Sequence, residues 1–258
     1  MKDSQLNKFQ TLVVVAGLAL IPAIAVAQSK SGASGVSPEQ RKAFEGVIKD
    51  YLLKNPIIIR QAIEALRTQE EAAKKAQAAA ALKTHKDQLF YDKTSPVAGN
   101  PKGDITIVEF FDYNCGYCKR AAPTLKAVMK KDPNVRIVYK EFAILGPKSI
   151  IAARAALAAQ RQGKYQEFHD GLMTGQADED SIAALANSLG MDYAKLRKDM
   201  GDPKINQVLQ NNYQLATTLG INGTPAFVIG ERLVPGAVGV AALTQIIKEE
   251  RAKMKAGK

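Results

Sequence analysis

The sequence predicts an α/β fold that is preceded by a separate segment of N-terminal helices. A strand-like run at Ile105–Phe111 is followed by a turn, a Cys-x-x-Cys motif and an amphipathic helix. Two further strand-like runs, Val135–Phe142 and Ala226–Gly230, are separated by a long stretch of helical periodicity. Upstream, residues 37–91 show helical periodicity only. Strands that alternate with helices are typical of an α/β architecture.

The first 27 residues are predicted to be a secretory signal peptide. Lys2 and Lys8 give a basic start, an apolar run follows at Leu12–Ile21, and Ala25-Val26-Ala27 supplies an A-x-A cleavage site. An uncleaved membrane anchor is the alternative, but a spanning helix needs about 20 apolar residues, and this stretch is shorter and broken by a glycine and a proline. Export predicts a periplasmic location, where disulfides persist.

The composition is that of a globular protein with a basic surface. The chain has 258 residues, 46% of them hydrophobic, which suits one large domain or one domain with a small extra segment. The net charge is +11, but the basic residues are scattered, so no nucleic-acid partner is expected. Two cysteines exclude a scaffold of several disulfides. We expect no bound cofactor.

Residues 28–91 are predicted to form a helical stalk. Ser37-Pro38-Glu39-Gln40 is typical of a helix start, Asn55-Pro56 ends that helix, and the Ala-rich run Glu70–Leu82 favours a long helix. Apolar residues recur on one helical face at Phe44, Val47, Ile48, Tyr51 and Leu52, and again at Ile59, Ile63 and Leu66. Such helices cannot form a core alone, so they pack on the main domain or, as we favour, on copies of themselves. The segment Asp92–Gly103, with its prolines and glycines, is predicted to be a linker.

Both cysteines lie in one four-residue window, Cys115-Gly116-Tyr117-Cys118, at the N-terminus of a helix predicted over residues 119–131. The thiolate is the reactive form of cysteine, and the free N–H groups and dipole of a helix start stabilise an anion. Cys115 is expected to be the attacking thiol, and Cys118, about one turn further on, can attack a mixed disulfide at Cys115. A zinc half-site and an inert disulfide are less favoured alternatives. Structural zinc needs four ligands, and the sequence does not offer four at a familiar spacing. A disulfide between Cys115 and Cys118 would close a very short loop and would therefore constrain the unfolded chain little.

A second signal lies far downstream, where Thr224-Pro225 precedes the strand-like run Ala226–Gly230. Alone this signal is weak, because X–Pro bonds are trans by default. Between Cys118 and this proline, the strand-like run Val135–Phe142 is followed by a series of helical runs. These are Lys148–Gln162, Lys164–Met173, Asp180–Leu189 and Ile205–Leu219.

Together, the strand, the CGYC motif at a helix start and the later GTPAFVIG run resemble the thioredoxin fold, and specifically its DsbA-like branch. The resemblance covers about residues 103–258 and implies a helical insertion at about 146–220. It also implies that a cis-proline loop at Thr224-Pro225 faces Cys115 and Cys118 and helps to bind substrate backbone. The expected domains are the signal peptide at 1–27, the stalk at 28–91 and the thioredoxin-like domain at 92–258.

With its N-terminal helices included, the mature chain resembles the suppressor-of-copper-sensitivity type C (ScsC) subgroup. This resemblance implies a periplasmic homo-oligomer, with a trimer favoured, that associates through residues 37–91. The subgroup includes disulfide isomerases. We expect exported proteins that contain cysteines as substrates and a membrane protein as redox partner.

The dipeptide between the cysteines bears on the direction of the reaction. DsbA-type oxidases carry Pro-His there, so the imidazole that helps to hold a thiolate at Cys115 is missing here. CGYC, with a threonine before the proline, resembles the DsbC-type isomerases. We therefore expect an isomerase or reductase, with Gly116, Tyr117, Thr224 and Pro225 binding substrate. A DsbA-type oxidase, a holdase chaperone and a Cu(I)-binding protein that uses the two thiolates are the alternatives.

Glu109 interrupts an otherwise apolar strand six residues before Cys115. By resemblance to the DsbA-like fold, it is a buried acid that passes protons to and from Cys118. The alternative is a strand residue that faces outward.

Other side chains near the motif have more than one interpretation. Phe111 and Tyr113 line a substrate groove or pack in the core. His85 and His169 are expected to be ordinary surface or packing residues.

Overall fold

The computed structural model describes residues 35–256. The chain divides into two compact units, one ending at Arg60 and the other beginning at Gln61. The predicted signal peptide, residues 1–27, lies outside the described residues. Among the helices that the structure describes, none is both long enough and apolar enough to cross a membrane.

The first unit contains α1 (Pro38–Lys54) and the start of α2 (Ile57–Thr84). α1 begins as predicted. The Ser37 hydroxyl accepts a hydrogen bond from the backbone N–H of Gln40, and the Gln40 side chain accepts one from the backbone N–H of Ser37. α1 buries no residue, and most of its large apolar side chains are more than half exposed, whereas Leu52 is partly buried. The exposed ones are Phe44, Val47, Ile48, Tyr51 and Leu53. The single chain therefore presents the predicted apolar face to solvent.

The second unit is built on a five-stranded mixed sheet with the order β1-β3-β2-β4-β5. The strands are β1 (Val97–Gly99), β2 (Ile105–Phe111), β3 (Val135–Glu141), β4 (Ala226–Ile229) and β5 (Arg232–Pro235). β2 and β3 are parallel, and the other neighbouring pairs are antiparallel. The three strands predicted from the sequence are confirmed to within a residue at each end. This sheet, with its helices, is the predicted thioredoxin fold.

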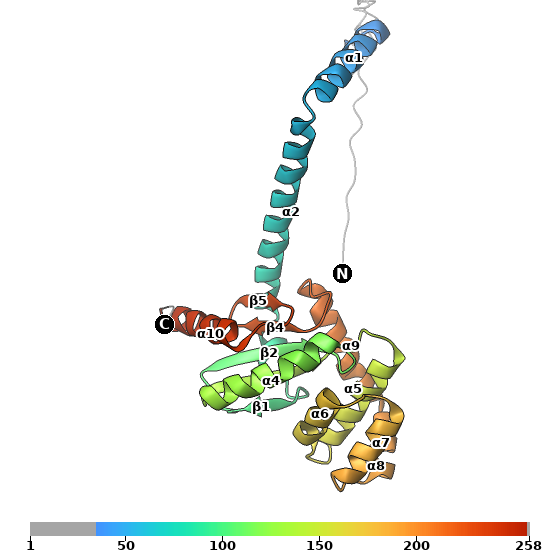
Figure 1. Ribbon diagram of the computed structural model, residues 1–258, viewed down its shortest axis with the longest axis vertical. Helices are drawn as coiled ribbons and strands as arrows, with labels where there is room; N and C mark the ends of the chain where they lie inside the picture. The colour runs from blue at the N-terminus through green and yellow to red at the C-terminus, as the bar shows by residue number, and fades with distance from the viewer. Residues whose placement is uncertain (1–34, 257–258) are drawn as a thin grey trace, which may run out of the picture. The chain divides into compact units, whose positions relative to one another are not determined.

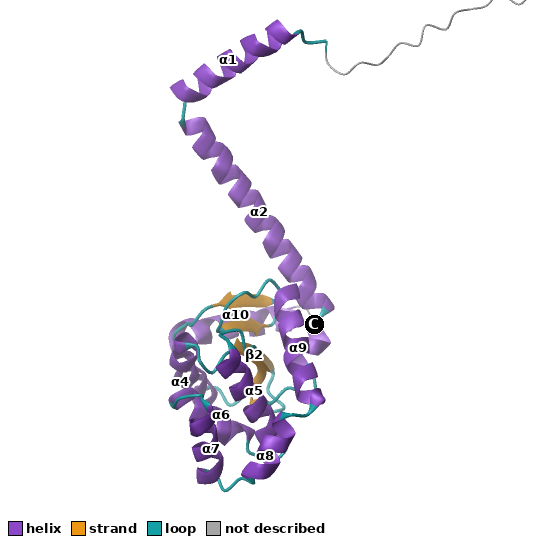
Figure 2. Ribbon diagram, turned by 90° about the vertical axis from the view of Figure 1, so that its right-hand side faces the viewer, coloured by secondary structure: helices purple, strands orange, loops and turns teal. Residues whose placement is uncertain are grey.

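Helices surround the sheet, as Figures 1 and 2 show. They are α3 (Lys86–Phe90), α4 (Gly116–Lys131), α5 (Pro147–Gln160), α6 (Tyr165–Thr174), α7 (Glu179–Ser188), α8 (Tyr193–Met200), α9 (Pro203–Thr218) and α10 (Val240–Ala256). The helices α5 to α9 all lie between β3 and β4 and form the predicted helical insertion. Within this insertion, only α8 was missed by the sequence periodicity, because it is a short and largely polar helix. Outside it, α10 was not predicted either.

The two faces of the sheet belong to two different parts of the core. Ile107, Phe111 and Ile137 point to the face that α4 and α10 cover, where the insertion also packs. Val108 and Val138 point to the other face, against α3, the end of α2 and part of α9. Successive strand residues alternate between the faces. Because both faces are buried, β2 and β3 are mostly apolar, which is what made them recognisable in the sequence.

The segment Asp92–Gly103 differs from its prediction as a linker, because it contains the edge strand β1. Val97 pairs with Val138 of β3 in an antiparallel register. β1 has three residues, too few to show an alternating pattern, and prolines at 96 and 101 flank it. Proline near an edge strand is tolerated because edge residues need not donate to a neighbour.

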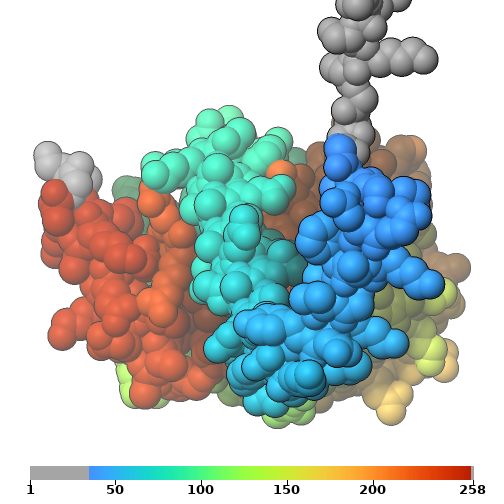
Figure 3. Space-filling view, turned by 90° about the horizontal axis from the view of Figure 1, so that it is seen from above, coloured from blue at the N-terminus to red at the C-terminus, as the bar shows by residue number. Residues whose placement is uncertain are grey.

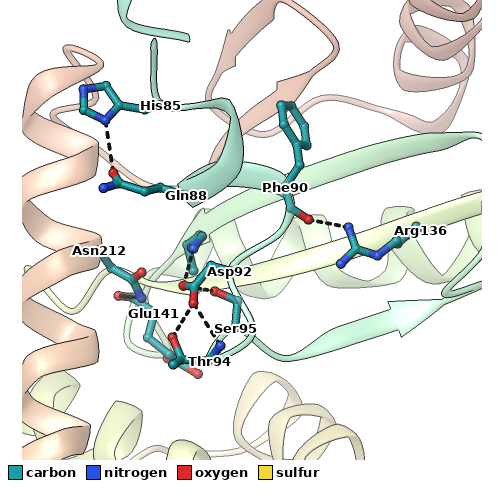
Figure 4. Close-up of polar contacts among 10 residues, drawn as sticks. His85, Gln88, Phe90, Asp92, Thr94, Ser95, Arg136, Glu141 and Asn212 are labelled. Atoms are coloured by element: carbon teal, nitrogen blue, oxygen red, sulfur yellow. Dashed lines mark hydrogen bonds and ion pairs between the residues drawn. The ribbon is translucent and has the colours of Figure 1, made fainter. Parts of the chain in front are cut away.

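The first residue of this segment and the residues that precede it are tied to β3, in part through two cations. The Arg136 guanidinium donates a hydrogen bond to the carbonyl of Phe90 at 2.7 Å (Figure 4). The Lys140 ammonium, which is 1% exposed, donates to Asp92 at 2.8 Å. Leu82 and Phe90 are themselves buried against the sheet. Residues 82–90, which the sequence assigned to the stalk, therefore pack on the sheet.

Candidate active site

Cys115 lies where β2 leads into α4. Residues 112–114 form a turn in which the backbone N–H of Cys115 donates to the carbonyl of Asp112 at 3.1 Å. Cys115 is the N-cap of α4, and its carbonyl accepts the hydrogen bond from the N–H of Lys119. Cys118 follows in the first turn of the helix, and both cysteines are free thiols. The predicted order of strand, turn, C-x-x-C and helix is confirmed.

The Thr224–Pro225 peptide bond is cis and lies against Cys115. The Cys115 Sγ donates a hydrogen bond to the Thr224 carbonyl oxygen at 3.2 Å, across a sequence separation of 109 residues. β4 begins directly after the proline, and its Ala226 is paired with Phe110 of β2. The sheet therefore holds the proline loop beside the Cys115 thiol.

The two thiols differ in burial and in acidity. Cys115 is 7% exposed, whereas Cys118 is fully buried. Burial alone would raise the pKa of Cys115, but hydrogen bonds from the Thr224 side chain and from the backbone around Cys118 and Tyr117 outweigh it, and the pKa is lowered. Burial raises the pKa of Cys118 well above its usual range, and the nearby Glu109 carboxyl raises it further. Of the two thiols, Cys115 therefore forms the thiolate more readily.

Glu109 is buried in the sheet, 1% exposed, so the interpretation as an outward-facing residue is wrong. It lies in β2 between Tyr139 of β3 and Phe227 of β4, and its Oε1 has no hydrogen-bond partner among the described residues. Burial raises the pKa of Glu109 to about 8. Glu109 stands in the same alternation as Ile107 and Phe111 along β2, so it points to the face of the sheet that α4 and Cys118 cover.

The dipeptide between the cysteines is exposed. The Arg120 guanidinium carbon lies 4.2 Å from the centroid of the Tyr117 ring, in a cation–π contact. A Cβ added to Gly116 would come within 3.7 Å of the same guanidinium. Phe111 and Tyr113, in contrast, are fully buried, so their interpretation as groove-lining residues is wrong.

Asp112 is a site residue that the sequence analysis missed. Its buried carboxylate accepts four hydrogen bonds, which come from the backbone of Asn114, Ile144 and Leu145 and from the hydroxyl of Ser149. These contacts join the turn before the motif to the loop after β3 and to the start of α5. The signal available in the sequence was an aspartate at a strand end, two residues before an asparagine, which is typical of a side-chain-stabilised turn.

A second buried polar cluster lies behind the motif. The Tyr113 and Tyr165 hydroxyls donate to Glu141 at 3.0 and 2.8 Å, and the Tyr113 hydroxyl also contacts the His169 ring at 3.1 Å. Burial lowers the pKa of His169 to about 3 and raises that of Glu141. His169 is therefore a neutral packing residue, one of the two roles expected for it. Nothing in the sequence links these residues, because they come from separate elements.

The described residues contain no group of three or more His, Cys, Asp or Glu side chains arranged to hold a metal ion. A Cu(I) ion at the motif would find two sulfur ligands, Cys115 and Cys118. His85 lies elsewhere, at the start of α3, where its ring contacts Gln88 at 3.0 Å (Figure 4).

Comparisons with known proteins agree with this geometry. The family model of the DSBA-like thioredoxin domain matches residues 106–248, more than half of the chain. The model of the copper resistance protein ScsC N-terminal domain matches residues 40–73. The chain spans about a quarter of the length of the first curated relatives that it matches, Na(+)/H(+) antiporters NhaA of Salinispora, at 27–30% identity.

Solved structures cover more of the chain. A thioredoxin-like oxidoreductase from Silicibacter pomeroyi is 47% identical, with 64% of this chain and 97% of that chain covered and a TM-score of 0.63. ScsC of Proteus mirabilis in a transitional conformation is 35% identical, with 85% and 98% covered and a TM-score of 0.63. The thiol-disulfide exchange protein alpha-DsbA2 of Wolbachia pipientis is 30% identical, with 69% and 97% covered and a TM-score of 0.64. The chain therefore belongs to the DSBA-like thioredoxin-domain family, and it carries an ScsC-type N-terminal domain.

Proposed function

We propose that the chain catalyses thiol–disulfide exchange on exported proteins, with Cys115 as the attacking thiol and Cys118 as the resolving thiol. The asymmetry of the two thiols carries this proposal. Cys115 has the lowered pKa and lies against the cis-proline loop, whereas Cys118 is buried with a raised pKa. A thiol that ionises readily, with a protonated thiol one turn away, is the arrangement that exchange requires.

The reaction follows from this asymmetry. The Cys115 thiolate attacks one sulfur of a substrate disulfide, a mixed disulfide forms, and the second substrate sulfur leaves as a thiolate. In isomerisation, that or another substrate thiolate attacks the mixed disulfide and returns Cys115 reduced, with no net transfer of electrons. In reduction, Cys118 loses its proton and attacks Cys115, so that the substrate gains two electrons and the protein is left with a Cys115–Cys118 disulfide.

Substrate binding is proposed for the exposed surface next to Cys115. Gly116 and Tyr117 are exposed beside the thiol, and the Thr224-Pro225 loop lies on its other side. An extended substrate segment along this loop would bring its disulfide to Cys115. The Tyr117 ring, held by Arg120, offers an apolar surface to the residues that flank the substrate cysteine.

Glu109 is proposed to move the proton of Cys118. Cys118 must lose its proton to resolve a mixed disulfide, and its burial makes direct loss to water unfavourable. A nearby carboxyl with a pKa of about 8 can accept that proton near neutral pH.

We favour isomerase or reductase activity over oxidation. The support is the Gly116-Tyr117 dipeptide, which lacks the imidazole of the oxidases, together with Thr224 and the exposed apolar face of α1. Several active sites around one cleft would help to hold a misfolded substrate.

Reactivation of ribonuclease with scrambled disulfides by the reduced protein tests this direction. We expect reactivation, its loss in Cys115→Ser, and partial activity in Cys118→Ser, because substrate thiols can resolve the mixed disulfide during isomerisation. If instead only the oxidised protein acts, by introducing disulfides into reduced ribonuclease, the chain is a DsbA-type oxidase. Full activity of Cys115→Ser would refute the catalytic proposal.

The N-terminal segment is proposed to form the homo-oligomer, with a trimer favoured. Its support is the row of exposed apolar residues on α1, since an unpaired helix with such a face is marginal in water. Sedimentation equilibrium of Val47→Glu with Ile48→Glu should give the mass of one chain, and Glu45→Gln with Asp50→Asn is the matched control on the same helix. A parent protein that is already a monomer would refute the proposal.

The compartment is proposed to be the periplasm, with a membrane protein as the redox partner. The support is the predicted signal peptide at residues 1–27 and the need of an exchange protein to be reduced or oxidised again after each turnover. Fractionation of cells that express the chain with and without residues 1–27 tests the location. Recovery of the full chain from the cytoplasm would contradict it.

A further inference from the structure

A cavity of about 700 Å³ lies at the end of the sheet opposite the cysteines. Its lining comes from the end of α2, from α3, from the start of β2, from the β4–β5 turn and from the last turns of α10. Figure 3 shows α10 in red, with the orange β4–β5 residues beside it. Ile105, the first residue of β2, lines the cavity, whereas Cys115 follows the other end of that seven-residue strand. At about 3.3 Å per residue, the strand separates the two sites by roughly 20 Å.

The charges of this cavity do not balance. Each of its acidic residues has a cationic partner, and the pairs are Glu250 with Lys253 at 2.6 Å, Asp104 with Arg251 at 2.7 Å and Glu231 with Lys83 at 3.8 Å. The lining also contains Lys86 and Arg136, and no carboxylate of the described residues lies within ion-pair distance of either. The lining holds four cations and three carboxylates, so it carries one surplus positive charge, and Arg136 and Lys86 are the two cations of the lining that have no carboxylate partner among the described residues.

The Arg136 side chain is held in a position where it can bind an anionic ligand. Its partly buried side chain reaches the cavity from β3, and one of its N–H groups donates to the carbonyl of Phe90 at 2.7 Å (Figure 4). A guanidinium has five N–H donors in a planar fork that matches the two oxygens of a carboxylate. Burial lowers the pKa of Arg136, as expected for a cation that has no anionic partner. Lys86 adds an exposed ammonium from α3.

The rest of the lining combines apolar side chains with the polar side chains of Tyr91 and Thr106. Leu82, Phe90 and Ile105 are buried, and Met254 of α10 is 45% exposed. A cavity of this size, lined by both apolar side chains and charged groups, can bind a small molecule that has an apolar and a charged part. The charged groups select an anion, and the apolar side chains select an aliphatic or aromatic body attached to it.

We propose that this cavity binds a small amphipathic anion, namely a carboxylate on an aliphatic chain of medium length. The carboxylate pairs with Arg136 and Lys86, and the chain packs on Leu82, Phe90 and Met254. The site is separate from the thiols, so its ligand does not take part in the exchange reaction. The proposal does not depend on the proposed function.

Displacement of a fluorescent fatty acid, 11-(dansylamino)undecanoate, from the reduced full-length protein tests the site. Decanoate is the competitor, below its micellar concentration, with decanol and decyltrimethylammonium as the neutral and cationic competitors of equal chain length. We expect both of these to compete at least tenfold more weakly than decanoate. Equal competition by the cation would overturn the proposal.

Two variants locate the site. Arg136→Met and Lys86→Met should each weaken decanoate binding at least tenfold, whereas Lys130→Met, which removes an exposed cation from α4, should leave it unchanged. Because Arg136→Met also removes the hydrogen bond to Phe90, the exposed Lys86 provides the variant that leaves the packing intact. Unchanged binding in both variants would overturn the proposal. Disulfide exchange by Lys86→Met should equal that of the parent, which distinguishes a failure here from a failure of the redox assignment.

Discussion

The thiol of Cys115 donates a hydrogen bond to the backbone carbonyl of Thr224, with 3.2 Å between the sulfur and the oxygen. The same threonine lowers the pKa of Cys115 through its side chain. One residue of a distant loop therefore both orients the thiol and stabilises the thiolate. Its backbone contact is available to any residue at this position, whereas the contribution to the pKa requires the hydroxyl.

Thr224→Val is expected to raise the pKa of Cys115. Valine keeps the shape of threonine but cannot donate to the thiolate. A hydrogen bond to a charged group contributes about 1.5 kcal/mol, which corresponds to roughly one pKa unit. Titration of the ultraviolet absorbance of the thiolate measures the shift. Thr218→Val, an exposed residue at the end of α9, is the matched control, and an identical titration in both variants would show that the Thr224 hydroxyl does not act on the thiol.

Glu109→Gln is expected to stabilise the fold at alkaline pH. Burial raises the pKa of Glu109 from 4.5 to about 8, so the folded state binds this proton more tightly than the unfolded state does. This tighter binding contributes to the free energy of unfolding below pH 4.5, and the contribution is lost as the pH rises to 8. Glutamine carries no charge and loses nothing as the pH rises. At pH 8 the free energy of unfolding of the variant should therefore exceed that of the parent by about 4 kcal/mol at most. Urea unfolding at both pH values measures this difference.

The same variant should slow resolution of the mixed disulfide by about a hundredfold, the usual contribution of a positioned proton acceptor. Rapid-quench measurement with a Cys115 mixed disulfide isolates this step from the initial attack, which should be unchanged. Glu231→Gln, an exposed residue of the β4–β5 turn, is the control. Equal resolution rates for the parent and Glu109→Gln would remove Glu109 from the proton path.

Asp112→Asn is expected to destabilise the second unit by about 3 kcal/mol. The buried carboxylate accepts four hydrogen bonds, and an amide in its place turns one acceptor into a donor that faces other donors. The turn before Cys115 should loosen, so exchange should slow even where the variant is fully folded. Urea unfolding and exchange rates on the same preparation measure both effects. The exposed Asp87→Asn serves as the control, and equal unfolding of all three proteins would contradict the prediction.

The catalytic part of the fold was predictable because its signals are local. Ile105–Phe111 is apolar on both faces of the sheet, and the cysteines follow directly at a helix start, so strand, turn and thiols could be read from one stretch of sequence. The position of Thr224 was reached only through resemblance to a family, because the contact joins residues 109 positions apart.

The remaining parts of the site depend on contacts that no local pattern carries. Glu141 and His169 meet through Tyr113, and each of the three comes from a different element. Strand β5 has four residues, too few for an alternating pattern to be distinguished from a loop. The linker prediction for Asp92–Gly103 failed for the same reason at β1, and it also missed the ion pair of Asp92 with Lys140 of β3.

The ion pair between Asp92 and Lys140 leads to the last prediction, which concerns the stability of the fold at acid pH. Burial alone would raise the pKa of Asp92, but hydrogen bonds from Lys140 and Thr94 outweigh it and hold the pKa at about 2, against 3.8 without these contacts. The stability from this difference is fully present above about pH 4 and is lost as the pH falls toward 2, and it amounts to about 2 kcal/mol.

Asp92→Asn should therefore be less stable than the parent at pH 7, where it leaves the buried Lys140 ammonium without its carboxylate. The difference in free energy of unfolding between the two proteins should narrow by about 2 kcal/mol as the pH is lowered from 5 to 2. The reason is that the parent loses the ion pair, whereas the variant has none to lose. Chemical unfolding across this range measures the gap. Asp104→Asn, whose partner Arg251 also bonds Asp132, is the control for an exposed pair. A gap that stays constant from pH 5 to pH 2 would show that Asp92 does not titrate with a lowered pKa in the folded protein.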